Sequence, residues 1–270
     1  MRNKQIMSTI HDLPKDILKN LIEDDEDGVL RCLCKRFNEI ACESISTLDM
    51  LCCHVKSLSK FVNLKHLTLI SNKIPDLKGV GMLKNLTSLE VVGSSKKGLI
   101  VLSEALPYLG NLSELILKGV NMGVKEAKTL GPALMTLSNL KKLNISDNNL
   151  GDEGLLELSP CFLRLETLDI SHTIDKPSLR MPEIIDAMTN LKSLTTYGNQ
   201  VKDEETANLL ALSFSKLTNL EDLDILDKDF PYVVLKSLQT LEDLSLSVYY
   251  SDDEHEQEYG LDDIIDTDSD

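Results

Sequence analysis

A widely spaced pattern of aliphatic residues recurs along most of this 270-residue chain. The clearest block is Leu64-x-x-Leu67-x-Leu69-x-x-Asn72-x-Ile74. Successive blocks begin 19, 22, 26, 28, 25, 26, 29 and 21 residues apart, with starts at Ile45 (the loosest match), Leu64, Leu86, Leu112, Leu140, Leu165, Leu191, Leu220 and Leu241. A unit of this length cannot bury its own apolar face, so neighbouring units have to stack on one another. The sequence therefore predicts a solenoid of about nine repeats with a broad curved surface.

The apolar spacing changes within each block. Leu143-Asn144-Ile145 alternates as a short half-buried strand does. Residues 154–163, and the stretches after Met122 and Val201, then have the spacing of a helix. One strand and one helix per unit predict an α/β solenoid with a parallel inner sheet and outer helices. The blocks resemble leucine-rich repeats, and the longer units resemble the ribonuclease-inhibitor-like class of that family.

The position eight residues after each start is expected to turn the chain at the end of the strand. A small polar side chain there can bond to the backbone of neighbouring turns and form a ladder inside the solenoid. Asn72, Asn148 and Asn199 suit this role best, Cys53, Ser94 and Thr173 suit it less well, and Val120, Lys228 and Tyr249 depart from it.

The third, fifth and seventh positions of each block are expected to point away from the core, because side chains alternate along a strand. These inner-face candidates are Asp49, His66, Thr68, Glu90, Glu114, Lys118, Lys142, Asn144, Asp169, Tyr197, Asp222, Asp224 and Asp243. Their C-terminal half is acidic, and Lys118 and Lys142 form a weak basic patch. Two alternatives are open: the positions are merely solvated, or they form the surface that binds a substrate protein, as is common in solenoids.

Charge is concentrated at the end of the chain. The formal net charge is -16, and residues 251–270 contribute ten acids and no Lys or Arg, which leaves -6 for the other 250 residues. This balance disfavours nucleic acid and favours a basic protein partner. We expect the tail to be disordered, with the alternative that Leu261, Ile264 and Ile265 dock part of it on the last repeat.

No catalytic, cofactor or metal site is expected from the sequence. Cys52-Cys53-His54 with His66 is a poor zinc set, because adjacent strand residues point to opposite faces. Asp222 and Asp224 lie on an open face, where a carboxylate pair stays solvated. No apolar run approaches the roughly 18 residues of a membrane span, and the N-terminus lacks a signal-peptide core. We therefore expect an intracellular, cytoplasmic or nuclear protein that is not an enzyme.

Residues 12–44, which follow an N-terminal arm at 1–11, are predicted to be helical. Their order, Leu13-Pro14-Lys15-Asp16-Ile17-Leu18 followed by Leu33-Cys34-Lys35-Arg36-Phe37, resembles the F-box motif, which begins Leu-Pro-x-Glu-Ile-Leu and ends Val-Cys-Lys-x-Trp-x-x-Leu-Ala. Phe37 stands where Trp is common. The residues that match adaptor-binding positions of the F-box are Leu13, Pro14, Ile17, Leu18, Leu21, Leu30, Leu33, Cys34, Phe37 and Ile40.

An F-box before leucine-rich repeats (45–250) is similar to the substrate receptors of Skp–cullin–F-box ubiquitin ligases. The resemblance implies that segment 12–44 docks on an Skp adaptor, and through it on a cullin. It also implies that the repeats bind the protein to be ubiquitinated. The alternative is a free-standing scaffold in which segment 12–44 only caps the stack and the acidic tail binds a basic partner such as histones.

Overall fold

The protein is a solenoid built on one parallel sheet. A computed structural model describes residues 46–51, 58, 61–70, 77–93, 96–174, 180–198, 204–225, 232–238, 241 and 244–248. Within these residues nine strands pair in chain order, each with the next, and all pairs are parallel. The strands are β1 (Thr47–Leu51), β2 (His66–Ile70), β3 (Ser88–Val92), β4 (Glu114–Ile116), β5 (Lys142–Asn144), β6 (Thr167–Asp169), β7 (Ser193–Thr195), β8 (Asp222–Ile225) and β9 (Ser245–Val248).

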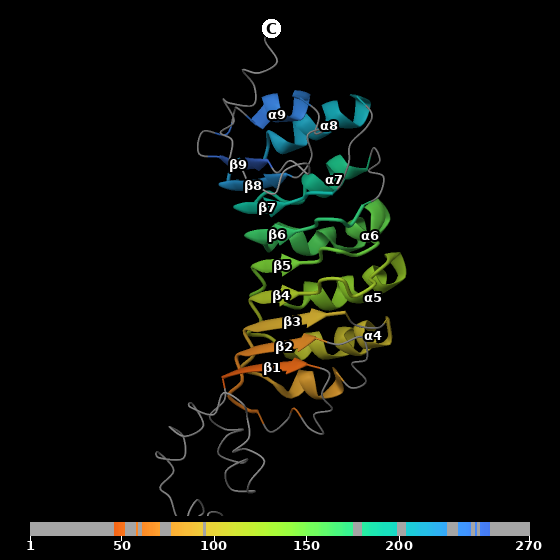
Figure 1. The fold of residues 1–270 in the computed structure, drawn as a ribbon, viewed down its shortest axis with the longest axis vertical. Coiled ribbons are helices and arrows are strands. Elements are labelled where there is room, and N and C mark those ends of the chain that lie inside the picture. The colour runs from red at the N-terminus through yellow and green to blue at the C-terminus, as the bar shows by residue number, and fades with distance from the viewer. Residues whose placement is uncertain are drawn as a thin grey trace, which may run out of the picture.

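Helices follow the strands and lie along one side of the sheet (Figure 1). They are η3 (Leu77–Met82), α4 (Lys96–Ala105), η4 (Leu106–Tyr108), α5 (Val124–Met135), α6 (Gly151–Leu158), η5 (Ser159–Arg164), α7 (Met181–Ile185), α8 (Glu204–Phe214) and α9 (Tyr232–Leu238). The predicted α/β leucine-rich-repeat solenoid is therefore confirmed. The arm at 1–11, segment 12–44 and the tail at 251–270 lie outside the described residues.

The helices of the repeats differ in length. The three stretches with predicted helical spacing form α5, α6 with η5, and α8. α7 has only five residues, and η3 is a 3-10 helix of six. The full helix expected for the longer units is therefore present in α5, in α6 with η5 and in α8, whereas α7 and η3 are short.

The core lies between the sheet and the helices. Each strand contributes a central leucine in register with the next, as in the pairings of Leu67 with Leu89 and of Leu115 with Leu143. The leucines that start the blocks, such as Leu64 and Leu112, are fully buried beside them. Each leucine of the strands between β1 and β9 is therefore flanked by the equivalent leucines of both neighbours, which is how stacking forms a continuous core.

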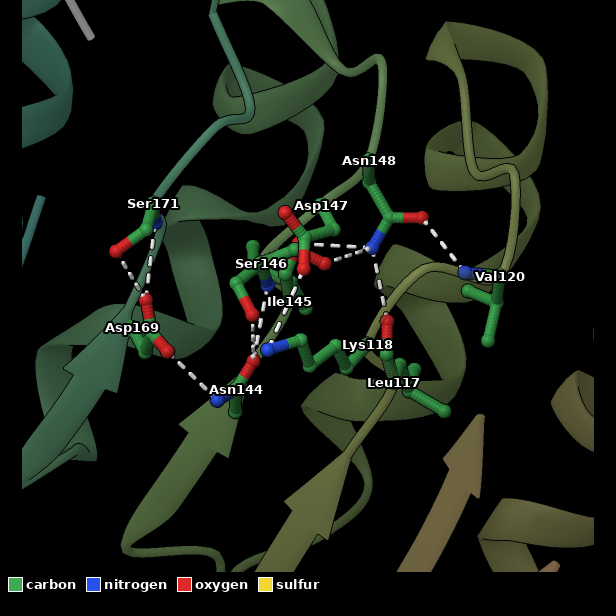
Figure 2. Close-up of polar contacts among 10 residues, drawn as sticks. All are labelled: Leu117, Lys118, Val120, Asn144, Ile145, Ser146, Asp147, Asn148, Asp169 and Ser171. Atoms are coloured by element: carbon green, nitrogen blue, oxygen red, sulfur yellow. Dashed lines mark hydrogen bonds and ion pairs between the residues drawn. The ribbon is translucent and has the colours of Figure 1, made fainter. Parts of the chain in front are cut away.

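Asn148 provides the predicted ladder. Its buried amide oxygen accepts the backbone N–H of Val120 (3.1 Å) and Met122 (3.0 Å), and its nitrogen donates to the carbonyls of Leu117 (2.8 Å), Ile145 (2.8 Å) and Ser146 (3.1 Å). Figure 2 shows how this amide spans two repeats. The Val120 side chain cannot form the ladder, but the Val120 backbone N–H donates to the Asn148 amide of the next repeat.

Of the other residues predicted to suit the ladder, Thr173 alone lies among the described residues. Thr173 is buried, and its hydroxyl donates to the Ile170 carbonyl of its own repeat at 2.6 Å. Asn72, Asn199, Cys53, Ser94, Lys228 and Tyr249 lie outside the described residues.

A second row of amides, which the sequence analysis did not identify, joins the repeats where the strands begin. An asparagine directly before the block start donates to a carbonyl of the preceding repeat: Asn85 to Val62 (2.8 Å), Asn111 to Lys84 (2.9 Å), Asn139 to Gly110 (2.7 Å), Asn190 to Leu163, and Asn219 to Thr189 (2.9 Å). Arg164 replaces this asparagine in one repeat and donates to the Met135 and Leu137 carbonyls, both at 3.1 Å.

Replacing Asn148 by Ala is expected to destabilise the solenoid by roughly 2–4 kcal/mol, because several buried backbone groups lose their partner at once. The adjacent Asn149, whose side chain is exposed, is a matched control. Asn149→Ala should change the free energy of unfolding by less than about 0.5 kcal/mol. Urea unfolding followed by circular dichroism measures both, and equal effects would contradict the ladder role of Asn148.

Candidate functional site

The inner face is the side of the sheet opposite the helices, and we define it by the third, fifth and seventh positions of each block. Burial alternates along the strands as predicted: in β5, Lys142 is exposed, Leu143 is buried and Asn144 is half-buried. Eleven predicted inner-face residues follow this alternation: His66, Thr68, Glu90, Glu114, Lys118, Lys142, Asn144, Asp169, Tyr197, Asp222 and Asp224. The side chains of Asp49 and Asp243 lie outside the described residues.

Parallel pairing places these residues in rows across the strands. The third-position row contains Ser88, Glu114, Lys142, Thr167, Ser193 and Asp222 in register, and the fifth-position row contains Glu90, Ile116, Asn144, Asp169, Thr195 and Asp224. Ser88, Ile116, Thr167, Ser193 and Thr195 were not among the predicted inner-face residues. The alternation of side chains along each strand, which predicted the other inner-face residues, also places these five on the inner face.

Hydrogen bonds fix the centre of the inner face (Figure 2). Asn144 donates its side-chain N–H to Asp169 Oδ2 at 2.7 Å. The other carboxylate oxygen, Asp169 Oδ1, accepts the backbone N–H (3.0 Å) and the hydroxyl (2.6 Å) of Ser171. Asn144 Oδ1 accepts the same two groups of Ser146, at 2.9 and 2.7 Å. Two neighbouring repeats therefore use the same local motif, and the Asn144–Asp169 bond links them.

The inner face is acidic at its C-terminal end and mixed at its centre. Asp169, Asp222 and Asp224 lie on β6 and β8, where the described inner-face positions hold no Lys or Arg. In the centre, Lys118 is already paired with Asp147, with Nζ 3.4 Å from Oδ2. The predicted basic patch therefore reduces to Lys142, which has no ion pair within the described part of the chain.

Hydroxyl groups of neighbouring strands bond to several of the inner-face carboxylates. Ser88 donates to Glu114 at 2.7 Å, Thr68 donates to Glu90 at 3.4 Å, and Thr195 donates to Asp224 at 3.5 Å. These bonds run across the strands, so a carboxylate of one repeat is oriented by a hydroxyl of the previous one. Such bonds orient the carboxylates without neutralising their charge.

A line of left-handed residues borders the inner face at the ends of the strands. The position seven residues after the block start has positive φ in five repeats: Gly93 (66°), Gly119 (61°), Asp147 (57°), His172 (51°) and Gly198 (75°). Glycine adopts this conformation without strain, whereas Asp and His pay a modest cost for it. The exposed His172 ring meets the Tyr197 ring edge-on, with 5.5 Å between centroids.

A row of alternating charges runs along the start of the strands, beside the inner face. Lys141 lies 3.0 Å from Glu166, and Lys192 lies 3.5 Å from Glu221. The hydrogen bond from Lys141 and its positive charge lower the pKa of the Glu166 carboxyl. All four side chains are well exposed, so these pairs contribute little to stability.

No three His, Cys, Asp or Glu side chains among the described residues come together as a metal-binding set. Burial raises the pKa of the Cys161 thiol to about 12, so this side chain stays protonated and unreactive. No helix among the described residues is long and apolar enough to cross a bilayer. Cys52, Cys53, His54 and all ten adaptor-binding candidates lie outside the described residues.

Gly198→Ala is expected to destabilise the protein more than Gly119→Ala. Both substitutions place Ala at positive φ, which costs about 1–2 kcal/mol. A Cβ at Gly198 would also clash with the His172 ring, whereas at Gly119 it meets only Asp147 Cβ at 4.0 Å. The extra destabilisation of Gly198→Ala relative to Gly119→Ala should disappear when His172 is also replaced by Ala. Thermal unfolding of the two glycine variants, each with and without His172→Ala, measures this difference. An unchanged excess would show that His172 is not its cause.

Comparisons with known proteins identify no family for this chain. No family model matches it, and no curated protein matches it. Among solved structures, an internalin from Listeria monocytogenes is similar to it, with 21% sequence identity and a TM-score of 0.48 over 80% of this chain. The similar region covers 64% of the internalin chain.

Proposed function

We propose that this chain is a non-enzymatic interaction scaffold that binds a protein partner on the inner face of its sheet. The observation that carries the proposal is the geometry of that face. All described helices lie on the other side of the sheet, so the polar rows of the strands remain open to a partner (Figure 1). Open curved sheets of this kind are the usual binding surfaces of solenoids.

The bonds at the centre of the face support this role physically. Asp169 and Asn144 are held by hydrogen bonds to the buried Ser171 and Ser146 beneath them and to each other. A side chain that is already ordered loses little conformational entropy when a partner binds. Five carboxylates against two lysines among the described inner-face candidates favour a partner with a basic surface (Glu90, Glu114, Asp169, Asp222, Asp224; Lys118, Lys142).

We also propose the finer role that the N-terminal motif implies: the chain is the substrate receptor of an Skp–cullin–F-box ubiquitin ligase. Segment 12–44 docks on the Skp adaptor, and the inner face holds the protein to be ubiquitinated. The chain supplies no reactive group in this role. It raises the effective concentration of the substrate beside the ubiquitin-loaded enzyme. The order of an F-box-like segment followed directly by the repeats supports this proposal.

A second candidate is a free-standing scaffold for a basic protein such as a histone, with segment 12–44 as a cap. The excess of acids on the inner face and in residues 251–270 favours it. The two candidates differ in one requirement. A receptor has to present Leu13, Ile17 and Phe37 to an adaptor, whereas a cap has to bury them against the first repeat.

The adaptor test uses the full chain and a Leu13→Ala/Ile17→Ala/Phe37→Ala variant, each purified together with an Skp adaptor. The receptor role predicts that the wild-type chain retains the adaptor and that the variant recovers at least tenfold less of it. Truncating three apolar side chains that contact the adaptor is expected to remove about 1–2 kcal/mol of binding free energy or more, which is enough for such a loss. Asp222→Asn/Asp224→Asn should retain the adaptor in full. Equal recovery by all chains, or none by the wild type, would leave the free-standing scaffold as the better proposal.

The inner-face test compares two double variants that change charge equally. Asp222→Lys/Asp224→Lys reverses two exposed or half-buried acids of β8, and Glu204→Lys/Glu205→Lys reverses two exposed acids of α8. Quantitative mass spectrometry of captured cellular proteins should show roughly tenfold loss of specific partners for the first variant only. Equal losses for both variants would mean that net charge, and not the inner face, determines binding.

A further inference from the structure

The outer surface carries an open groove between α8 and α9, at the C-terminal end of the solenoid. Its volume is about 380 Å³, and its lining residues are Asn208, Ala211, Leu212 and Ser215 on one side and Val233, Lys236 and Ser237 on the other. The first set recurs at i, i+3, i+4 and i+7, and the second at i, i+3 and i+4. Each helix therefore presents one continuous stripe to the groove.

The groove is more apolar than its residue types suggest. The Ser215 hydroxyl donates to the Leu212 carbonyl at 2.9 Å, and the Ser237 hydroxyl donates to the Val234 carbonyl at 2.6 Å. Both hydroxyls are thus turned to the backbone of their own helix. Leu212 has 63% of its surface exposed beside them. A leucine this exposed in a groove is well placed to be covered by an apolar segment.

One positive charge remains available at the groove. Lys236 is exposed and has no ion pair with any described residue. Lys216, two residues after the end of α8, is different, because its ammonium group lies 2.9 Å from both carboxylate oxygens of Asp186. A segment that fits this groove therefore combines aliphatic side chains with at least one carboxylate.

We propose that residues 261–266 of the acidic tail dock in this groove. In Leu261-Asp262-Asp263-Ile264-Ile265-Asp266 the aliphatic residues fall at i, i+3 and i+4, which places them on one face of a helical turn. Aspartates flank them, and the whole stretch of 251–270 has ten acids and no Lys or Arg. The aliphatic face matches Leu212 and Val233, and the flanking carboxylates match Lys236.

The length of chain beyond the last strand permits this contact. β9 ends at Val248, and 12 residues (249–260) separate it from Leu261. Such a stretch spans at most roughly 45 Å when extended. α9 belongs to the repeat that starts at Leu220, and β9 is the next described strand, so the groove lies between the two repeats that precede β9 and is within reach.

Hydrogen exchange of the full-length chain tests the docking. Amides of residues 261–266 are expected to exchange at least about tenfold slower than their intrinsic rate, which corresponds to a segment that is docked about 90% of the time. Leu212→Asp, or Leu261→Ser/Ile264→Ser/Ile265→Ser, should abolish this protection. Lys236→Glu should weaken it, because it replaces attraction for the tail by repulsion.

Two matched controls separate docking from general effects. Leu163→Asp changes another exposed leucine, 52% accessible, and Lys125→Glu reverses another exposed lysine, so both should leave the protection unchanged. Protection that is absent in the wild type, or that survives Leu212→Asp, overturns the proposal. Protection that falls on dilution also overturns it, because the groove would then hold the tail of a second copy. None of these outcomes depends on what the inner face binds.

Discussion

Contacts between neighbouring repeats hold this protein together, and the rest of the structure depends on them. At the start of each strand from β1 to β7 one carbonyl accepts two backbone N–H groups of the next repeat, as Ser113 does from Lys141 (2.9 Å) and Lys142 (3.0 Å). The passage from one repeat to the next also stacks one buried strand leucine on its equivalent in the next repeat. A single repeat has neither partner, so its backbone groups and its leucines are satisfied only within the stack.

Two amide rows support this stacking at opposite ends of the strands, and they differ in energetic weight. Asn148 is buried and bonds to five backbone groups, so water cannot replace it there. The asparagines before the block starts, such as Asn85 and Asn111, are exposed, and each forms one bond to the preceding repeat. Water competes for those bonds, so they define the spacing of the repeats more than they stabilise the solenoid.

Because the helices and the leucines occupy one side of the sheet, the inner face is free of packing constraints. Its side chains are therefore able to serve recognition, and the bonds among Asn144, Asp169, Ser146 and Ser171 keep part of that surface fixed. Two non-glycine residues at positive φ, Asp147 and His172, border the same surface. Asp147 holds Lys118, and His172 contacts Tyr197, so each contributes a side chain where glycine would leave a gap.

The spacing of leucines by itself determined the strand, the helix and the face that each inner residue occupies, because burial of a repeated apolar pattern permits only one way of stacking. It also identified Asn148, since a polar residue among core positions has to bond to the backbone. It could not identify the Lys118–Asp147 pair, the contact of His172 with Tyr197, or the groove beside Leu212. These depend on how far apart successive repeats lie and how their turns are oriented. Only the tertiary structure decides that, because the residues involved belong to different repeats, 18 or more positions apart in the chain.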